Sequence, residues 1–334
     1  MTDQRIGFIG LGAMGAPMAA RLLAGPGTLA VFDPVAARRD ELAGGGAVPA
    51  ATAAEAAKEA DLLFVMVVDE AQCRQALLGP DGAATVLAPG AVVVLMSTVG
   101  PDAVRRLATA LAEANVELVD APVSGGVARA AAGDLLIMAS GPPAAVERAR
   151  PALDLIGSTV VVCGETAGDG QAVKLVNQLL CGVHIAAAGE ALAYAQALGL
   201  DPAAVYKTVR HGAAGSFMLD DRGSRMIGRE FGAVKSALDL FVKDLGLVTS
   251  SAAAQRFPAT MAATANSLFL MGAALGYGGE DDSGILRVFE QWTGRPAAEP
   301  PGWTSCRGSP TNPPDPPRQD LDPNLLPRSR RRTP

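Results

Sequence analysis

Hydrophobic residues in the first half of the chain gather in short runs that alternate with Ala-rich, amphipathic stretches. The runs have the length of single strands and lie at residues 6–9, 29–32, 62–67, 92–96 and 117–120. The stretches with helical periodicity include residues 16–23, 36–43, 53–59 and 101–114. Short, apolar strands separated by helices predict a parallel sheet that helices cover on both faces, and later runs at residues 135–139 and 160–163 extend it.

The pattern changes after residue 164. Residues 170–198 contain no proline and many strong helix formers, which predicts one helix of roughly 40 Å at 1.5 Å per residue. The chain then stays helical to residue 289, with breaks near residues 199–202, 212–215, 257–258 and 276–279. The predicted fold class is therefore α/β: an N-terminal Rossmann-type doubly wound domain, a long connecting helix and an all-α C-terminal domain.

Two changes in composition set the predicted domain boundaries. A dinucleotide-binding domain is expected at residues 1–165, and an all-helical substrate and oligomerisation domain, which begins with the long helix, at residues 166–292. In residues 293–334 Pro, Ser and Arg are abundant, and the hydrophobic residues show no helical or strand periodicity. This composition predicts a disordered tail. The arginines near its end leave a partner-binding segment as the alternative.

Three glycines near the amino terminus give the chain its clearest chemical motif. Gly10, Gly12 and Gly15 have the G-x-G-x-x-G spacing and stand between the first predicted strand and the first predicted helix. In that context the glycines allow a tight turn, a close backbone approach to a pyrophosphate, and close packing of the helix on the strand. We therefore predict that a dinucleotide binds along the loop, whose residues are Gly10, Leu11, Gly12, Ala13, Met14 and Gly15.

An acidic residue, Asp33, ends the second predicted strand about 20 residues after the glycines, where a carboxylate accepts hydrogen bonds from the adenosine ribose of NAD. The 2′-phosphate of NADP would meet a like charge there, and Arg38 and Arg39 follow only on the next helix. NAD is thus the predicted cofactor, and NADP is less favoured. The alternative is that Asp33 only caps that helix.

Composition and charge argue against several classes of protein. The net charge of −6 argues against a nucleic-acid surface. The four cysteines are scattered and His184 and His211 lie far apart, so we expect no metal site and a reducing, cytoplasmic location. Residues 1–5 lead straight into the first strand, and the most apolar strand is too short to span a bilayer, so we expect no leader and no membrane partner.

A lysine on the long predicted helix supplies candidate acid–base chemistry. Lys174 and Asn177 are three residues apart and Gln178 follows, so the three side chains share one helix face. Burial, or a second cation nearby, lowers the pKa of a lysine, and such a lysine accepts the proton that an alcohol loses during hydride transfer. The alternative is a solvated surface charge.

A second candidate is the turn of Ser124, Gly125 and Gly126, which follows the strand predicted at residues 117–120. Ligands of open α/β sheets bind at such strand ends. Glycines leave backbone N–H groups unobstructed, and the serine adds a hydroxyl donor, so the turn is suited to a substrate carboxylate. The alternative is a merely flexible turn.

Four segments in this order resemble the β-hydroxyacid dehydrogenase family, which includes 3-hydroxyisobutyrate dehydrogenase and tartronate semialdehyde reductase. They are the glycine loop, residues 120–126 (DAPVSGG), residues 168–177 (GDGQAVKLVN) and residues 241–245 (FVKDL), and the resemblance covers about residues 5–291. It implies that the Ser124 turn holds the substrate carboxylate, that Lys174 accepts the hydroxyl proton, and that Asn177 orients the hydroxyl or the lysine. Gln178 lies beside them as a substrate-binding candidate.

The resemblance also implies roles for residues outside these two groups. Lys243 is similar to the second lysine of the family, which approaches the substrate or the nicotinamide, and Asp244 pairs with it or orients it. Thr98, Val67 and Val68 match positions that line the cofactor. The structural alternatives are a helix-capping threonine and two sheet valines.

The activity implied is hydride transfer between NAD and a small hydroxy acid. Residues 177–188, 236–247 and 276–283 are similar to family members that act on L-threonate, so L-threonate or a similar sugar acid is the preferred substrate. Asn177 stands where the threonate-type motif has a histidine, which leaves 3-hydroxyisobutyrate and tartronate semialdehyde as alternatives. A non-catalytic dinucleotide-binding scaffold is the alternative from another class.

The long helix also bears on assembly. An Ala-rich helix that is apolar nearly all round needs packing partners on every side. We therefore expect a homodimer or a homotetramer in which the helical domains cover one another.

Overall fold

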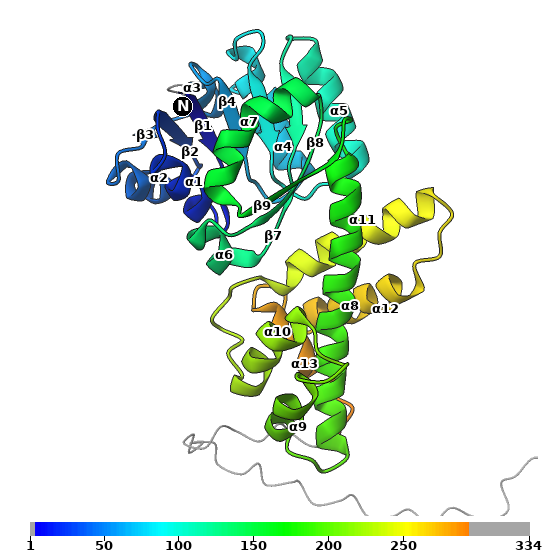
Figure 1. The fold of residues 1–334 in the computed structure, drawn as a ribbon. Coiled ribbons are helices and arrows are strands. Elements are labelled where there is room, and N and C mark those ends of the chain that lie inside the picture. The colour runs from blue at the N-terminus through cyan, green and yellow to red at the C-terminus, as the bar shows by residue number, and fades with distance from the viewer. Residues whose placement is uncertain (1–3, 294–334) are drawn as a thin grey trace, which may run out of the picture. The chain divides into compact units, whose positions relative to one another are not determined.

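The computed structural model describes residues 4–293 of the 334-residue chain. These residues form a nine-stranded sheet with helices on both faces, followed by a part built of helices (Figure 1). This architecture confirms the predicted fold class. The tail predicted at residues 293–334 lies, apart from Thr293, outside the described residues, and the domain boundaries stay a prediction.

Six parallel strands make up most of the sheet, in the order β3-β2-β1-β4-β5-β6. They are β1 (Arg5–Ile9), β2 (Thr28–Phe32), β3 (Val48–Pro49), β4 (Leu62–Val65), β5 (Val92–Leu95) and β6 (Glu117–Asp120). All of them except β3 match predicted strands. Strand β3 was not predicted because two residues show no hydrophobic periodicity. The strand order reverses between β1 and β4, and ligands of such sheets bind outside the carboxyl ends of the strands at that point.

Alternating side chains of these strands build two hydrophobic cores, one on each face of the sheet. Phe8 and Phe64 stack on one face with ring centroids 6.0 Å apart. Leu63 and Val65 belong to the core on the opposite face. The first core is covered by α1 (Gly15–Leu23), α2 (Ala36–Ala43), α6 (Gly126–Ala132) and α7 (Pro143–Ile156), and the second by α3 (Ala53–Ala57), α4 (Glu70–Leu78), η1 (Ala83–Thr85) and α5 (Pro101–Ala112).

The far side of the sheet departs from the parallel arrangement that the hydrophobic runs predict. Strand β8 (Leu136–Ser140) runs antiparallel to β6 and to the short strand β7 (Val123–Ser124), and β9 (Thr159–Gly164) pairs parallel to β8. Because β7 pairs with β8, the segment after β6 folds back as a hairpin around α6, and β8 enters the sheet in the reversed direction.

Helix α8 (Asp169–Ala197) confirms the single long helix predicted at residues 170–198. It contacts β8 and β9 and, further along, α10, α11, α12 and α13. The remaining helices are α9 (Pro202–Val209), α10 (Phe217–Gly228), α11 (Leu238–Ala254), α12 (Thr260–Ala274) and α13 (Leu286–Glu290). Among the described residues α8 is the one helix long and apolar enough to cross a membrane, a test that core helices of soluble proteins also pass. The cytoplasmic location stays a prediction.

A buried ion cluster fixes the irregular segment between α10 and α11, a break that the sequence pattern does not predict. Arg222 Nη2 lies 2.8 Å from Asp282 Oδ2 at the start of η2 (Asp282–Ile285), and Arg225 pairs with Asp281. Asp281 also accepts a hydrogen bond from the Lys235 backbone N–H at 2.9 Å, and both aspartates are fully buried. The cluster therefore ties the chain after α10 to η2.

Candidate active site

The glycine loop leaves β1 where the strand order reverses. The Gly10 N–H donates to the Phe32 carbonyl at 2.9 Å, and a Cβ on Gly10 would lie 2.3 Å from the carbonyl oxygen of Met66. A Cβ on Gly15 would lie 1.8 Å from the Gly10 carbonyl oxygen, so α1 packs directly on the strand end. A Cβ on Gly12, by contrast, would meet nothing within 4 Å. The loop is therefore open at Gly12, which agrees with the predicted close approach of a pyrophosphate to its backbone.

Helix α1 begins directly behind this opening. Ala13 is exposed, and Met14 is the N-cap residue, whose side chain makes no capping hydrogen bond. The N–H groups at the start of α1 are therefore not capped by the Met14 side chain, and the positive end of the helix dipole faces the loop. Both features suit a phosphate.

Asp33 lies beside the loop and is only 3% exposed. Its carboxylate accepts hydrogen bonds from the Leu11 N–H at 2.8 Å and from the Val35 N–H at 2.9 Å, while Arg38 Nη1 approaches to 3.4 Å. Asp33 thus binds the backbone just before α2, at its N-cap residue Val35, without capping the helix, and it also binds the glycine loop. The carboxylate therefore lies where the loop and the end of β2 meet.

The residues predicted to line the cofactor follow the neighbouring strands β4 and β5. The Val67 N–H donates to Ser97 Oγ at 2.8 Å, which joins the two segments, and Val68 is 57% exposed. The carbonyl of Thr98 accepts a hydrogen bond from Lys243 Nζ at 2.8 Å. Because Lys243 belongs to α11, this bond brings the helical part of the chain to the carboxyl ends of the strands.

Lys174 lies in the second turn of α8 and is 6% exposed. Burial is the main cause that lowers the pKa of its amine below that of a free lysine; the charge of Lys243 lowers the pKa further, whereas Asp244 raises it. Within residues 4–293 the amine has no hydrogen-bond or ion-pair partner. It is therefore a buried amine of lowered pKa whose hydrogen-bonding capacity is unused by the described residues.

A row of hydrogen bonds runs along the same side of α8. Ser124 Oγ donates to Asn177 Oδ1 at 3.4 Å, and Asn177 Nδ2 donates to Gln178 Oε1 at 2.8 Å. Gln178 Nε2 donates to Asp244 Oδ2, and the other carboxylate oxygen of Asp244 lies 2.8 Å from Lys243 Nζ. The row connects the predicted carboxylate-binding turn with α11, so residues from three distant segments meet here.

The turn after Ser124 has a backbone that favours glycine. The φ angles of Gly125 and Gly126 are 142° and 75°, in the region that residues with a side chain rarely adopt. A Cβ on Gly126 would meet nothing within 4 Å, and α6 begins at this residue. The turn therefore presents backbone to open space next to the Ser124 hydroxyl.

Sequence reasoning missed two residues that touch this set. Cys181 Sγ accepts a hydrogen bond from Asn177 Nδ2 at 3.4 Å, and burial raises the pKa of its thiol. Ser97, which binds Val67, is fully buried. The spacing of four residues after Asn177 is the signal that could have found Cys181; no pattern marks Ser97.

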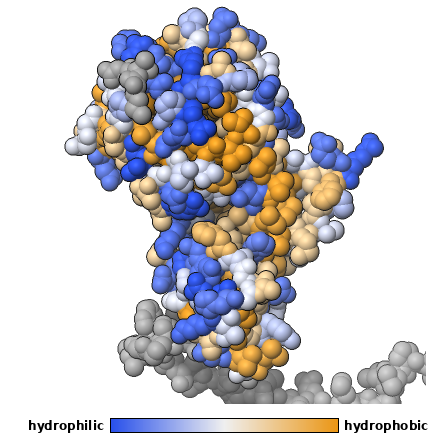
Figure 2. Space-filling view, in the orientation of Figure 1, coloured by the Kyte–Doolittle hydropathy of each residue, from blue (hydrophilic) through white to orange (hydrophobic). Residues whose placement is uncertain are grey.

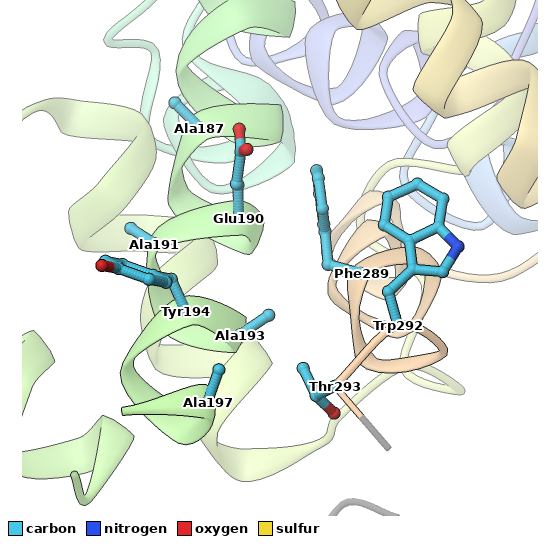
Figure 3. A pocket seen from close by; sticks show the side chains of 9 residues that line it. All are labelled: Ala187, Glu190, Ala191, Ala193, Tyr194, Ala197, Phe289, Trp292 and Thr293. Carbon is cyan, nitrogen blue, oxygen red and sulfur yellow. The ribbon is translucent and has the colours of Figure 1, made fainter. Parts of the chain in front are cut away.

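A hollow at the other end of α8 takes no part in this arrangement. Tyr194, Phe289 and Trp292 line it together with Glu190 and several alanines (Figure 3). The nearest lining residue in sequence, Ala187, lies about 20 Å along the helix axis from Lys174 at 1.5 Å per residue. The candidate site is thus confined to the first turns of α8 and the strand ends.

Two family models match successive parts of the chain. Residues 5–164 match the model described as the NAD binding domain of 6-phosphogluconate dehydrogenase. Residues 168–289 match the model described as the NAD-binding domain of NADP-dependent 3-hydroxyisobutyrate dehydrogenase. The two matches meet between β9 and α8, and together they show binding of NAD(P) without distinguishing the two forms.

Individual relatives cover nearly the whole described chain. L-threonate dehydrogenase of Cupriavidus necator is 40% identical over 300 residues, which are 90% of this chain and 99% of the relative. L-threonate dehydrogenase of Escherichia coli K12 is 40% identical over 292 residues, 86% of this chain and 95% of the relative. The crystal structure of a 3-hydroxyisobutyrate dehydrogenase from Salmonella typhimurium is 40% identical, has a TM-score of 0.81, and covers 86% of this chain and all of that one.

These similarities agree with the chemistry that the geometry allows. A glycine loop open to a pyrophosphate lies at the strand ends, and a buried amine of lowered pKa lies near a turn that presents backbone and a hydroxyl. The scaffold alternative requires no such base. The chain belongs to the β-hydroxyacid dehydrogenase family and is an enzyme that transfers a hydride between NAD(P) and a hydroxy acid.

Proposed function

We propose that the chain oxidises L-threonate or a similar sugar acid with NAD, and that Lys174 accepts the proton of the oxidised hydroxyl. The observation that carries this role is the burial of the Lys174 amine, which lowers its pKa, on the side of α8 that also bears Asn177. A lysine with a lowered pKa is a general base at moderate pH. The choice of substrate rests on the similarity to the L-threonate dehydrogenases.

The proposed mechanism divides carboxylate binding, orientation and proton transfer among the side chains. A bound nicotinamide supplies the acceptor for the hydride. Ser124 and the backbone N–H groups of Gly125 and Gly126 hold the substrate carboxylate. Asn177 orients the hydroxyl, and Lys174 Nζ takes its proton while the C–H bond breaks, so that a carbonyl forms and the amine becomes an ammonium.

Gln178 and Lys243 support this arrangement from the helical part of the chain. Gln178 accepts from the Asn177 amide and donates to Asp244, which fixes the orientation of the asparagine. Lys243 binds the Thr98 carbonyl and contributes to the low pKa of Lys174. We therefore assign Lys243 and Asp244 to the wall against which substrate and nicotinamide lie.

The proposed preference for NAD rests on Asp33. A buried carboxylate at the end of β2 accepts hydrogen bonds from the ribose hydroxyls and repels a 2′-phosphate. Arg38, whose guanidinium lies 3.4 Å from this carboxylate, is the cation that a 2′-phosphate would reach instead.

A panel of C3 to C5 hydroxy acids, each assayed for reduction of NAD and of NADP, tests the proposed function. We expect the largest kcat/KM for L-threonate with NAD. A preference for 3-hydroxyisobutyrate or glycerate would keep the chemistry and replace the substrate, and a preference for NADP would overturn the role of Asp33. Absence of reduction with every acid, in protein that binds the cofactor, would contradict the proposal.

We also propose a homodimer or homotetramer assembled through the helices. Large apolar side chains are exposed along α8 and α12, and hydrophobic residues gather beside the first half of α8 in Figure 2. They include Val173, Val176, Leu180, Met261, Leu270 and Met271. Light scattering at micromolar concentration is expected to give at least twice the mass of one chain, and a single-chain mass would contradict this assembly.

A further inference from the structure

A carboxylate that the proposed mechanism does not use lies at the end of β6. Asp120 is fully buried, and its two oxygens accept four hydrogen bonds. Oδ2 accepts from Ser140 Oγ at 3.3 Å, from the Gly168 N–H at 3.2 Å and from the Gln171 N–H at 2.8 Å. Oδ1 accepts from Gln171 Nε2 at 2.9 Å. One side chain thus ties the sheet to the first turn of α8.

Gln171 extends these ties to the segment after β5. Its Oε1 accepts hydrogen bonds from the N–H groups of Val99 and Gly100, each at 2.9 Å. Its Nε2 donates to the Ser97 carbonyl at 3.0 Å as well as to Asp120. Gln171 is fully buried, so every polar atom of its side chain is occupied by a group of the protein.

Asp120 and Gln171 are close in sequence, or bonded through the backbone, to three parts of the proposed site: Lys174, the Ser124 turn and the Thr98 segment. Lys174 follows Gln171 by three residues, which is slightly less than one helical turn. Ser124 follows Asp120 by four residues, and Thr98 stands between Ser97 and Val99, two of the three residues whose backbone Gln171 binds.

We infer that Asp120 and Gln171 are positioning residues, which hold the start of α8, and with it Lys174, in fixed register against the Ser124 turn and the Thr98 segment. The inference rests on the proposed role of Lys174 as the proton acceptor. Neither residue touches the reacting atoms; each acts through the helix that carries the base.

The buried hydrogen bonds around Asp120 and Gln171 restrict the position of the first turn of α8. A buried network specifies one arrangement, because any shift leaves a donor or an acceptor unpaired. A Cβ on Gly170 would lie 2.3 Å from the Met138 carbonyl oxygen, and the Gly170 N–H donates to Ser140 Oγ at 2.9 Å. Helix α8 therefore starts in contact with the sheet and is held there by polar bonds of defined direction.

The ionised form of Asp120 is the one that accepts all four bonds. Burial raises the pKa of this carboxyl to about 6, while the hydrogen bonds from Gln171 oppose the shift. The Cys163 thiol in β9 faces this carboxyl: burial, followed by the charges of Asp120 and Asp169, raises the pKa of the thiol. Activity is therefore measured at alkaline pH, where Asp120 is ionised.

The substitution Asp120→Asn tests the inference with little change in volume. In either orientation the new NH2 group faces a donor, which is Gln171 Nε2 on one side and the N–H groups of Gly168 and Gln171 on the other. We expect kcat to fall by about 10²-fold, the loss that follows a misplacement of about 1 Å, while the Kd for NADH stays at the wild-type value. The rate is expressed per NADH-binding site, so unfolded protein does not lower the measured kcat.

A kinetic isotope effect separates positioning from a general structural defect. The substrate is deuterated at the carbon whose hydroxyl is oxidised, and kcat is compared with that of the protiated acid. A lower kcat with an isotope effect equal to or larger than that of the wild type means that the chemical step is slower, as we expect. An unchanged kcat, or a lower kcat with a smaller isotope effect, would overturn the inference.

Two further variants keep the result interpretable. Ser140→Ala removes one of the four hydrogen bonds to Asp120 and also the acceptor of the Gly170 N–H. It is expected to lower kcat in the same way but less, because Asp120 keeps its other three bonds, and it tests the inference if Asp120→Asn fails to fold. Asp169→Asn removes an acid from the same helical turn while the bonds of Asp120 remain, and it is expected to have wild-type kcat. Lys174→Ala is assayed in parallel: if it stays active, the proposed base is wrong, whereas an inactive Lys174→Ala beside a fully active Asp120→Asn rejects only the positioning role.

Discussion

Replacement of Lys174 by alanine is expected to lower kcat by about 10³-fold or more, which is within the range that a positioned general base contributes. The reason is that this amine is buried, has a lowered pKa, and is the group that removes the hydroxyl proton in the proposed mechanism. The cofactor loop lies at the strand ends rather than on α8, so the Kd for NADH is expected to stay unchanged. Steady-state kinetics and a fluorescence titration of NADH give both quantities.

Lys174→Arg is the matched variant for this prediction. It retains a long cationic side chain, but a guanidinium is not deprotonated in proteins, so it is expected to be as inactive as the alanine variant. Lys207→Ala, on the exposed surface of α9, serves as the control and should keep the wild-type rate. Substantial turnover by Lys174→Arg would mean that the amine supplies charge rather than accepting a proton.

Gly12→Val is expected to weaken NADH binding by about 10²-fold without destabilising the fold. A side chain at this position meets no protein atom within 4 Å of its Cβ, so the fold has room for it, whereas the pyrophosphate does not. The loss corresponds to one or two hydrogen bonds to a charged phosphate, each about 1.5–3 kcal/mol, at about 1.4 kcal/mol per tenfold change in Kd. Thermal unfolding and an NADH titration measure the two effects separately.

Two glycine variants serve as comparisons for Gly12→Val. Gly232→Val also places a side chain in open space, but away from the loop, and should change neither NADH affinity nor stability. Gly15→Ala should lower the melting temperature, because its Cβ would lie 1.8 Å from the Gly10 carbonyl oxygen. If Gly12→Val binds NADH as tightly as the wild type, the pyrophosphate does not lie at this opening.

Most of the sheet and the long helix could be predicted from hydrophobic periodicity. The strands of the parallel sheet are buried on both faces, so their apolar runs are continuous and easy to detect. Strands β3 and β7 have two residues each, and α4 and α6 have weak or short periods, so none of them was predicted. The antiparallel direction of β8 depends on its pairing with β7, which is a contact between segments and leaves no local pattern.

The candidate site also has a part that could be predicted from the sequence and a part that could not. The glycine loop, Asp33 and the face shared by Lys174 and Asn177 follow from spacing along the chain, because turns and helices translate spacing into position. The bonds from Lys243 to Thr98 and from Gln178 to Asp244 join residues that are 145 and 66 positions apart. Such contacts depend on how α11 packs on the rest of the protein, and no local pattern reports that packing.

The proton-accepting role of Lys174 is tested most directly by pre-steady-state kinetics. Wild type, Lys174→Ala and Lys174→Arg are each mixed with saturating NAD and the preferred acid of the panel, and NADH absorbance is followed at alkaline pH in a stopped-flow instrument. The account predicts a rapid phase of NADH formation in the wild type and at least a 10²-fold slower one in both variants, at wild-type NADH affinity. Rapid phases of equal rate in all three proteins would show that hydride transfer proceeds without a base at Lys174.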